Sequence, residues 1–294
     1  MEPALIGSIS KQVEEVFEKM AKEAAEQQRI KKKLEQERQK QEEEEEEKEK
    51  EAKRAVKIPF HLRVITGASS NHYKSLIQLL DSLCTHNEPS EVELIVWDLG
   101  LTETERKSIE AEYSLTLRIF DYSQYPSYFN IQVAAGEYAW KPTLIYETTK
   151  ELGDGVYLWL DAGDKVTKSL KVVNEHITRH GIYSPVSDGT ISEWTYVKVF
   201  DAIEPIYRKY MRLHNRNGAV LGFNTTVPWV KNFVEVFADW AGRKEVIAPE
   251  GSSRTNHRQD QALFSLLYWD AQRMHRFDTI ANYRDTIRIH QDID

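Results

Sequence analysis

Hydrophobic and polar positions divide this chain into two unlike parts. From Glu35 to Glu51 every residue is Glu, Gln, Lys or Arg, so this stretch has no apolar side chain to bury. Before it, a short heptad-like seam repeats at spacings of four and three residues; its members are Val13, Phe17, Met20 and Ala24. High helix propensity and many i,i+4 charge pairs predict one long, solvated helix over residues 9–55. We therefore expect a charged, coiled-coil-like arm over residues 1–57 and a folded domain over residues 58–294.

Two interpretations of this arm stay open. In one, residues 9–55 mediate self-association or docking to a partner; in the other, the helix binds nothing. Glu42 to Glu47 are six consecutive glutamates, which would repel a second copy of the helix in parallel register. The pattern therefore favours neither interpretation.

After Ile58 the periodicity changes to that of a globular domain. Short apolar runs predict strands over residues 62–66, 92–97, 115–120, 156–160, 182–184 and 219–223. Helices are expected after Asn71, over 102–112, from Lys141-Pro142 onward, and over 201–213, 228–241 and 260–273. Asn71 is expected to cap its helix, and Thr102 with Glu105 has the spacing of a capping box. Because strands and helices alternate, we expect an α/β domain with a mostly parallel, Rossmann-like sheet flanked by helices.

The carboxyl ends of the strands are where a sheet of this kind binds its ligand. The segments predicted to meet there are Thr66 to Ser70, Asp98, and Asp161 to Asp164. A tyrosine-rich loop over residues 121–138 separates the third strand from the helix that starts at Lys141-Pro142. The chemistry is therefore expected at one edge of the sheet.

Composition and charge narrow the classes of function. The net charge of −8 at pH 7 argues against nucleic-acid binding, which needs a basic face. No run of about 18 apolar residues is present, so no transmembrane segment is expected. The N-terminus lacks a basic region followed by a long apolar stretch, so we expect a cytoplasmic protein without a signal peptide. The single cysteine, Cys84, excludes an intrachain disulfide and is expected to pack in the core.

The strongest local motif follows the strand over residues 156–160. Asp161-Ala162-Gly163-Asp164 places two carboxylates in a tight turn, where Gly163 lets the backbone reverse. Carboxylate oxygens are ligands that suit Mg²⁺ or Mn²⁺, and such an ion neutralises a diphosphate. The alternative is an ordinary turn that closes a strand with solvated carboxylates.

With this motif, residues 60–290 resemble the GT-A-type nucleotide-sugar-dependent glycosyltransferases, which carry an Asp-x-Asp motif after an apolar strand. Asp161 stands where the family's first aspartate stands, whereas the second falls on Gly163 and the acid comes one residue later, at Asp164. The resemblance implies a GT-A-like fold and a Mn²⁺ or Mg²⁺ site made by Asp161, Asp164 and the late histidine His290. A metal-independent variant stays open because of the shifted register.

Further segments extend the resemblance to the nucleotide-sugar donor site. The resemblance implies donor contacts from Thr66, Gly67, Ala68, Asp98, Lys141, Asp161, Gly222 and Asn224. Small residues in the first turn would let backbone amides approach the nucleotide. A lysine at a helix N-terminus is electrostatically unfavourable unless an anion is bound beside it. The alternatives are everyday turn chemistry and a solvated lysine.

The segment before the last helix resembles the place where the family carries an Asp-Gln pair near the transferring sugar. The resemblance implies that Asp260 is the catalytic residue, while the alternative is that Asp260 caps the helix. Trp194, Tyr196 and Trp229 are candidates to stack on acceptor sugars, or else are core aromatics.

The function that the resemblance implies is transfer of a hexosyl or pentosyl group. The donor is a nucleotide sugar, taken as a UDP-sugar, and the acceptor is a hydroxyl of a glycan or other molecule, with a metal ion assisting. One alternative is a non-catalytic adaptor that works through its charged helix. Another is a sugar nucleotidyltransferase, although the turn from Thr66 to Ser70 lacks the basic residues such enzymes carry.

Overall fold

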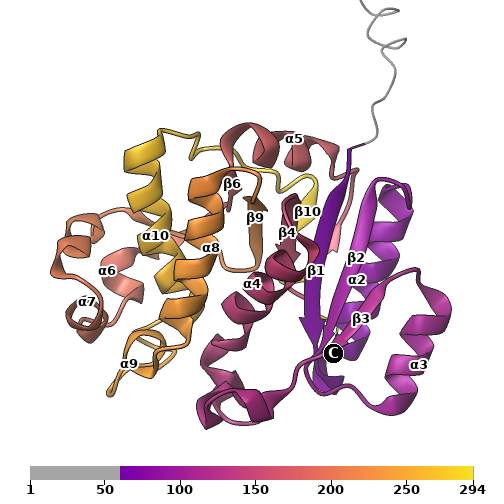
Figure 1. Cartoon of the computed structure of the whole chain (residues 1–294), viewed down its shortest axis with the longest axis horizontal. Coiled ribbons are helices and arrows are strands. Elements are labelled where there is room, and N and C mark those ends of the chain that lie inside the picture. Colours follow the sequence, from indigo (N-terminus) through magenta and orange to yellow (C-terminus); the bar gives the residue numbers. More distant parts are fainter. Residues whose placement is uncertain (1–59, 294) are drawn as a thin grey trace, which may run out of the picture. The chain divides into compact units, whose positions relative to one another are not determined.

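A six-stranded sheet forms the centre of residues 60–293, the part of the chain that this computed structural model describes (Figure 1). Its strands are β1 (Leu62–Ala68), β2 (Val92–Asp98), β3 (Thr116–Ile119), β4 (Val156–Leu160), β6 (Ile182–Tyr183) and β9 (Val220–Asn224). Their order is β3-β2-β1-β4-β9-β6. β1 to β4 run parallel, and β9 runs antiparallel to both of its neighbours. The expected mostly parallel α/β sheet is confirmed.

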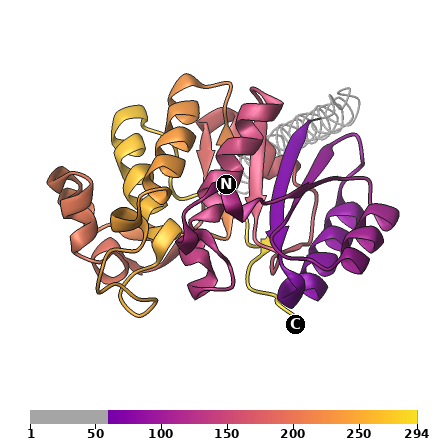
Figure 2. The same cartoon turned by 60° about the horizontal axis from the view of Figure 1, so that its bottom comes forward.

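Helices cover both faces of the sheet (Figures 1 and 2). The longer ones are α2 (Tyr73–His86), α3 (Glu103–Glu112), α4 (Trp140–Leu152), α5 (Lys171–His180), α8 (Pro228–Ala241) and α10 (Gln259–His275). Successive residues of β1 point to opposite faces, as a strand requires. Val64 packs in the cluster that contains the apolar faces of α2 and α5, and Ile65 packs with those of α4, α8 and α10.

Shorter elements complete the domain around this sheet. They are β5 (Lys165–Val166), β7 (Val186–Thr190), β8 (His214–Arg216), β10 (Ile287–Arg288), α6 (Ile191–Trp194), α7 (Lys198–Ala202) and α9 (Lys244–Ile247). β10 pairs with β5, and the amide of Gln291 then donates to the Gly163 carbonyl at 2.6 Å. The end of the chain therefore lies against the acidic turn that follows β4.

Local signals explain where several helices begin and end. The capping box of α3 is present: the Glu105 amide donates to Thr102 Oγ1 at 3.2 Å, and the Thr102 amide donates to the Glu105 carboxylate at 2.7 Å. Pro228 occupies the first turn of α8, where its missing N–H costs nothing. α4 ends at Gly153, whose φ of 77° lies in the left-handed region that glycine adopts without strain.

Three expectations about local structure are wrong. Asn71 does not cap α2; it lies in a short 3-10 turn, and its side chain accepts from Ser69. The helix expected over 201–213 is divided into α7 and a 3-10 turn, because Pro205 cannot continue an α-helix. Cys84 is exposed, since it follows Leu83 and therefore lies off the buried face of α2.

Several predictions fall outside this part of the chain. The charged helix over 9–55, its self-association or docking, and the arm over 1–57 concern residues that the structure does not describe, so they stay predictions. Between residues 60 and 293 we find no helix whose length and apolar character would let it cross a bilayer. The cytoplasmic location stays a prediction as well.

Candidate functional site

Lys141 is the centre of an ionic cluster at the carboxyl end of the sheet. The first turn of α4 places it there with a side chain that is only 4% exposed. Its Nζ lies 2.9 Å from Asp161 Oδ1 and 3.2 Å from Asp260 Oδ2, and it donates to the Gly218 carbonyl at 3.2 Å. Asp161 Oδ1 also accepts from Trp159 Nε1 at 2.7 Å. Three residues singled out by sequence are therefore brought into direct contact.

Electrostatics keeps the cluster charged. Burial lowers the pKa of Lys141, but the carboxylates of Asp161 and Asp260 outweigh burial, so its pKa is raised and the ammonium stays protonated. Burial raises the pKa of Asp260, and the Lys141 charge counters this only in part. A carboxylate whose pKa is raised toward the working pH is a better general base than an ordinary one.

Asp164 is the least satisfied group of the cluster. Its side chain is completely buried, and neither oxygen has a hydrogen bond of good geometry among the described residues, although the backbone amides of Asp161 and His290 lie near enough to lower its pKa. Burial and the nearby Asp161 charge raise its pKa well above the usual value, while Lys141 and the His290 amide act in the opposite direction. An ionised carboxylate is costly to bury without a partner. Asp164 therefore either takes up a proton or requires a positively charged ligand.

A cavity of about 280 Å³ opens onto this cluster. Lys141, Asp161 and Asp260 line it together with Arg254 and Arg258. Arg258 stacks over the Trp194 ring at 4.2 Å, and Arg254 lies 5.6 Å from the Tyr138 ring. Between residues 60 and 293 neither guanidinium has an acidic partner. The wall of the cavity therefore carries two guanidinium groups, whose paired N–H donors suit a phosphate.

Sequence reasoning missed these arginines and the buried amide of Asn215. Both polar atoms of the Asn215 side chain are without a partner in the described residues, although the residue is completely buried and lines the cavity. The only signal for Arg258 is its place two residues before Asp260. Arg254 comes from an irregular segment and Asn215 from the three-residue strand β8, and neither is long enough or regular enough for periodicity to carry information.

The wall of the cavity also contains a left-handed turn. Ala134, Ala135, Glu137 and Tyr138 have φ values of 47°, 54°, 47° and 56°. This conformation costs about 1–2 kcal/mol for each residue other than glycine. At Gly136 a Cβ would collide with the Phe129 carbonyl, so no larger residue fits. Strain of this kind concentrates at functional sites, and here it places Tyr138 against the cavity.

The residues predicted to bind the donor nucleotide either have other partners already or do not line the cavity. Asp98 Oδ1 accepts from the Gly100 and Leu101 amides, and its Oδ2 pairs with Arg106 at 2.9 Å. Both oxygens of the Asp98 carboxylate therefore already have partners in and beside the turn after β2. Thr66, Gly67 and Ala68 lie at the end of β1 but do not line the cavity. Their role in donor binding stays a prediction.

Gly222 and Asn224 do not line the cavity, and their role in donor binding stays a prediction. β9 runs antiparallel to β4, so Asn224 pairs with Val156 at the amino end of the sheet. Its side chain donates to the Thr178 carbonyl and accepts from Thr226. A Cβ on Gly222 would collide with Ile177, so this glycine allows close packing of α5 on the sheet.

The predicted metal ligands Asp161, Asp164 and His290 carry donor atoms that suit a divalent ion. Their ligand atoms do not form one compact group. The two oxygens of Asp164 are buried without partners, and Asp161 Oδ2 has none among the described residues. His290 lines the same cavity as Asp161. In residues 60–293, the ligand atoms that lie within 4.8 Å of one another belong instead to His176, His180 and Asp278. The metal role of Asp161, Asp164 and His290 stays a prediction.

The aromatic candidates divide between two places. Trp194 lines the cavity beneath Arg258. Trp229 lies elsewhere and stacks on His275 at 4.4 Å, while the Tyr196 hydroxyl lies near Gly251. Stacking on an acceptor is therefore open to Trp194 alone of the three.

Comparison with families and curated proteins gives one match. A family model described as "Protein of unknown function (DUF1647)" matches residues 10–146, which is less than half of the chain. A comparison with curated proteins finds no match.

Comparison with solved structures identifies the fold. The galactosyltransferase LgtC, in complex with donor and acceptor sugar analogs, aligns over 76% of this chain and 74% of its own with 16% identity and a TM-score of 0.50. GlyE of Streptococcus pneumoniae TIGR4 aligns over 76% and 46% with 12% identity and a TM-score of 0.44. Mouse xyloside xylosyltransferase 1 aligns over 72% and 82% with 13% identity and a TM-score of 0.42. The domain has a GT-A glycosyltransferase fold, an assignment that rests on LgtC because the other two scores are lower.

Proposed function

We propose that the domain transfers a sugar from a nucleotide-sugar donor to a hydroxyl acceptor. The observation that carries this proposal is the buried Lys141, which joins Asp161 and Asp260 at the floor of a cavity. The wall of this cavity holds two arginines that have no acidic partner within residues 60–293. A cavity with cations for a diphosphate and a carboxylate for a hydroxyl contains the groups that glycosyl transfer requires. The GT-A fold agrees with this chemistry.

The cationic side chains act on the leaving group. In the reaction the bond from the anomeric carbon to the diphosphate oxygen breaks, and the electron pair leaves with the nucleoside diphosphate. Arg254 and Arg258 would bind the diphosphate through their planar N–H forks. Lys141 would stabilise the charge that develops on it, because a fixed buried ammonium needs no reorganisation during the reaction.

Asp260 acts on the acceptor or on the sugar. Its carboxylate is held by Lys141 at 3.2 Å, and its raised pKa suits a group that takes up a proton. As a base in line with the breaking bond, it would accept the proton of the acceptor hydroxyl while the new carbon–oxygen bond forms, and the configuration would invert. If it only orients the sugar, retention is expected.

A divalent ion would be held by Asp161 and Asp164, with His290 as a third ligand. When bound, Mn²⁺ or Mg²⁺ supplies positive charge that neutralises the diphosphate. The fit rests on the unpartnered oxygens of Asp164 and on the hard-oxygen chemistry of the two carboxylates. Asp164 would then be ionised, because a cation beside it lowers its proton affinity.

Nucleotide binding to the full-length chain tests this proposal. We expect UDP to bind, with UDP-sugars as the first donors examined, and Arg258→Gln to weaken binding at least about tenfold because a charge-assisted phosphate contact is lost. Arg212→Gln is the matched control, since Arg212 is exposed and lies outside the cavity. Equal affinity in the two variants would remove Arg258 from the donor site. Release of pyrophosphate from a nucleoside triphosphate and a sugar phosphate would favour nucleotidyl transfer instead.

A further inference from the structure

A second group of ligating side chains lies on α5, away from the cavity described above. His176 and His180 are four residues apart on this helix, so their rings lie on the same side, with centroids 4.5 Å apart. Asp278 joins them from the segment that follows α10. One ligand atom of each residue lies within 4.8 Å of the others.

The surroundings hold these rings in place. His176 is buried, and the edges of Tyr183 and Tyr283 pack against it at 5.3 Å and 5.6 Å. The backbone N–H of Asp278 donates to His180 Nδ1 at 3.4 Å, which keeps the aspartate beside the ring. An ion would replace this long contact, because a neutral imidazole has only one free nitrogen lone pair. A cavity of about 240 Å³ adjoins the group at His180, so this ring has a side open to solvent.

We propose that His176, His180 and Asp278 bind one divalent transition-metal ion of the Zn²⁺ class. Two imidazoles and a carboxylate suit zinc and its neighbours, whereas Mg²⁺ and Ca²⁺ prefer oxygen ligands alone. Two imidazoles at this spacing on one helix are a known way to hold zinc. Three protein ligands leave one position of a tetrahedral ion for water.

Some charges around His176, His180 and Asp278 favour binding of a metal ion, and others oppose it. Burial and the neighbouring His180 lower the pKa of His176 to about 4, so its ring is neutral at pH 7, as a ligand must be. The Asp278 carboxylate attracts a cation, while Arg179 and Arg216 lie close enough to His176 to oppose one. We therefore expect an affinity in the micromolar range rather than that of a closed structural zinc site.

The bound ion would join two segments that are distant in sequence. It would tie α5 to the segment after α10, which continues into β10 and then to His290 at the cavity. Zinc is therefore expected to raise the melting temperature, because it binds the folded arrangement and not the separated residues. This site does not depend on the proposed sugar transfer.

Calorimetric titration of the metal-free, full-length chain with Zn²⁺ tests the proposal. We expect a zinc-binding step of one ion at this group, at least tenfold weaker in His180→Gln and in Asp278→Asn and separate from any ion at the acidic turn. His275→Gln is the matched control, since His275 lines the same neighbouring cavity as His180 but is not part of the group. The melting temperature of each variant in EDTA shows whether it is folded. The zinc-binding step that His180→Gln weakens should persist when Asp161 is replaced by Asn, which separates this site from the one at the acidic turn.

Two results would overturn the proposal. One is a zinc affinity in His180→Gln and Asp278→Asn equal to that of the unaltered chain, provided the melting temperatures in EDTA agree. The other is an equal loss in His275→Gln, which would indicate diffuse binding by surface histidines. An increase in melting temperature with Mg²⁺ as large as that with Zn²⁺, lost in both His180→Gln and Asp278→Asn, would also exclude a preference of this group for Zn²⁺.

Discussion

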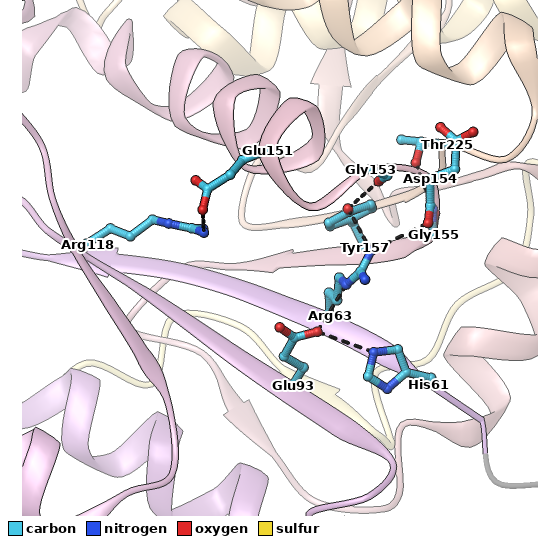
Figure 3. Close-up of polar contacts among 10 residues, drawn as sticks. All are labelled: His61, Arg63, Glu93, Arg118, Glu151, Gly153, Asp154, Gly155, Tyr157 and Thr225. Carbon is cyan, nitrogen blue, oxygen red and sulfur yellow. Dashed lines mark hydrogen bonds and ion pairs between the residues drawn. The ribbon is translucent and has the colours of Figure 1, made fainter.

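The two ends of the central sheet use charge in opposite ways. At the amino end, Arg63 donates to Glu93 at 3.0 Å and to the Tyr157 hydroxyl at 2.9 Å, and His61 joins the same carboxylate (Figure 3). These groups are partly exposed, with 19% of the Arg63 side chain and 35% of the Glu93 side chain accessible. At the carboxyl end, Lys141 and Asp260 are only 4% and 7% exposed.

The two ends also differ in whether their buried polar atoms have hydrogen-bond partners. In residues 60–293, ten buried side-chain polar atoms have no hydrogen bond of good geometry. Four of them belong to Asn215 and Asp164, and a fifth, Asp260 Oδ2, has only the Lys141 ammonium at 3.2 Å. Native proteins leave few such atoms, and those that remain require an explanation. The amino end is built for stability, whereas the carboxyl end keeps polar groups available for a ligand.

Replacement of Lys141 should have the largest effect on stability. Lys141→Met leaves Asp161 and Asp260 side by side without their shared cation, and breaking a buried pair costs about 3–5 kcal/mol. Urea denaturation at pH 7 measures this loss. Arg63→Met is the control from the amino end, where a partly exposed pair contributes at most about 1 kcal/mol. Equal losses in the two variants would remove the distinction between the two ends.

Asp164→Asn should make the domain more stable at pH 8. The change removes a buried carboxylate that has no partner, and each unit by which the pKa is raised corresponds to about 1.4 kcal/mol. We expect a gain on the order of 1 kcal/mol in the free energy of unfolding. Asp98→Asn is the control and should lose stability, because the Asp98 carboxylate is fully paired. A less stable Asp164→Asn chain would show that the ionised form is stabilised in the fold.

The gain in Asp164→Asn should depend on pH. The folded pKa of Asp164 lies above its unfolded value of 3.8, so the unaltered domain gains stability from this group as pH falls through the folded pKa. The difference between the two chains should therefore shrink from pH 8 toward pH 5. His176 and His257 have pKa values lowered to about 4 and lose stability below pH 6.5 in both chains, so only the difference is informative. A constant difference would contradict the raised pKa.

Glu93→Gln should have the smallest effect. It breaks the contacts of Glu93 with Arg63 and His61, which are partly exposed and contribute about 0.2–1 kcal/mol. Adding 1 M salt to the unaltered chain should reproduce most of this loss, because salt screens exposed charges and affects buried ones much less. A loss above about 2 kcal/mol would place the amino end in the same class as the carboxyl end.

Sequence was sufficient to predict the core of the candidate site. Asp161 follows an apolar strand, Lys141 begins a helix and Asp260 lies in the first turn of another, and all three positions face the carboxyl edge of an α/β sheet. These positions follow from strand and helix boundaries, which periodicity predicts well. The same boundaries predicted α8 without error.

Other features of the site depend on information that the sequence pattern lacks. Nothing in the pattern of β9 shows that this strand runs antiparallel, which places Asn224 at the opposite edge of the sheet from Asp161. The left-handed turn at residues 134–138 arises from tertiary packing against Phe129. The burial of Asp164 depends on the end of the chain, where Gln291 bonds to Gly163 from more than a hundred residues away.

Release of nucleoside diphosphate from UDP-sugars measures whether the carboxyl-end cavity transfers sugar with Asp260 as its catalytic carboxylate. We expect the unaltered chain to release the diphosphate. Asp260→Asn should be at least about a hundredfold slower, since general bases contribute roughly 10²–10⁴ in rate. Its melting temperature and UDP affinity should be nearly unchanged, because Lys141 keeps Asp161 as a partner. Equal release by the two chains would contradict the catalytic role of Asp260. No release by the unaltered chain with any donor would contradict sugar transfer itself.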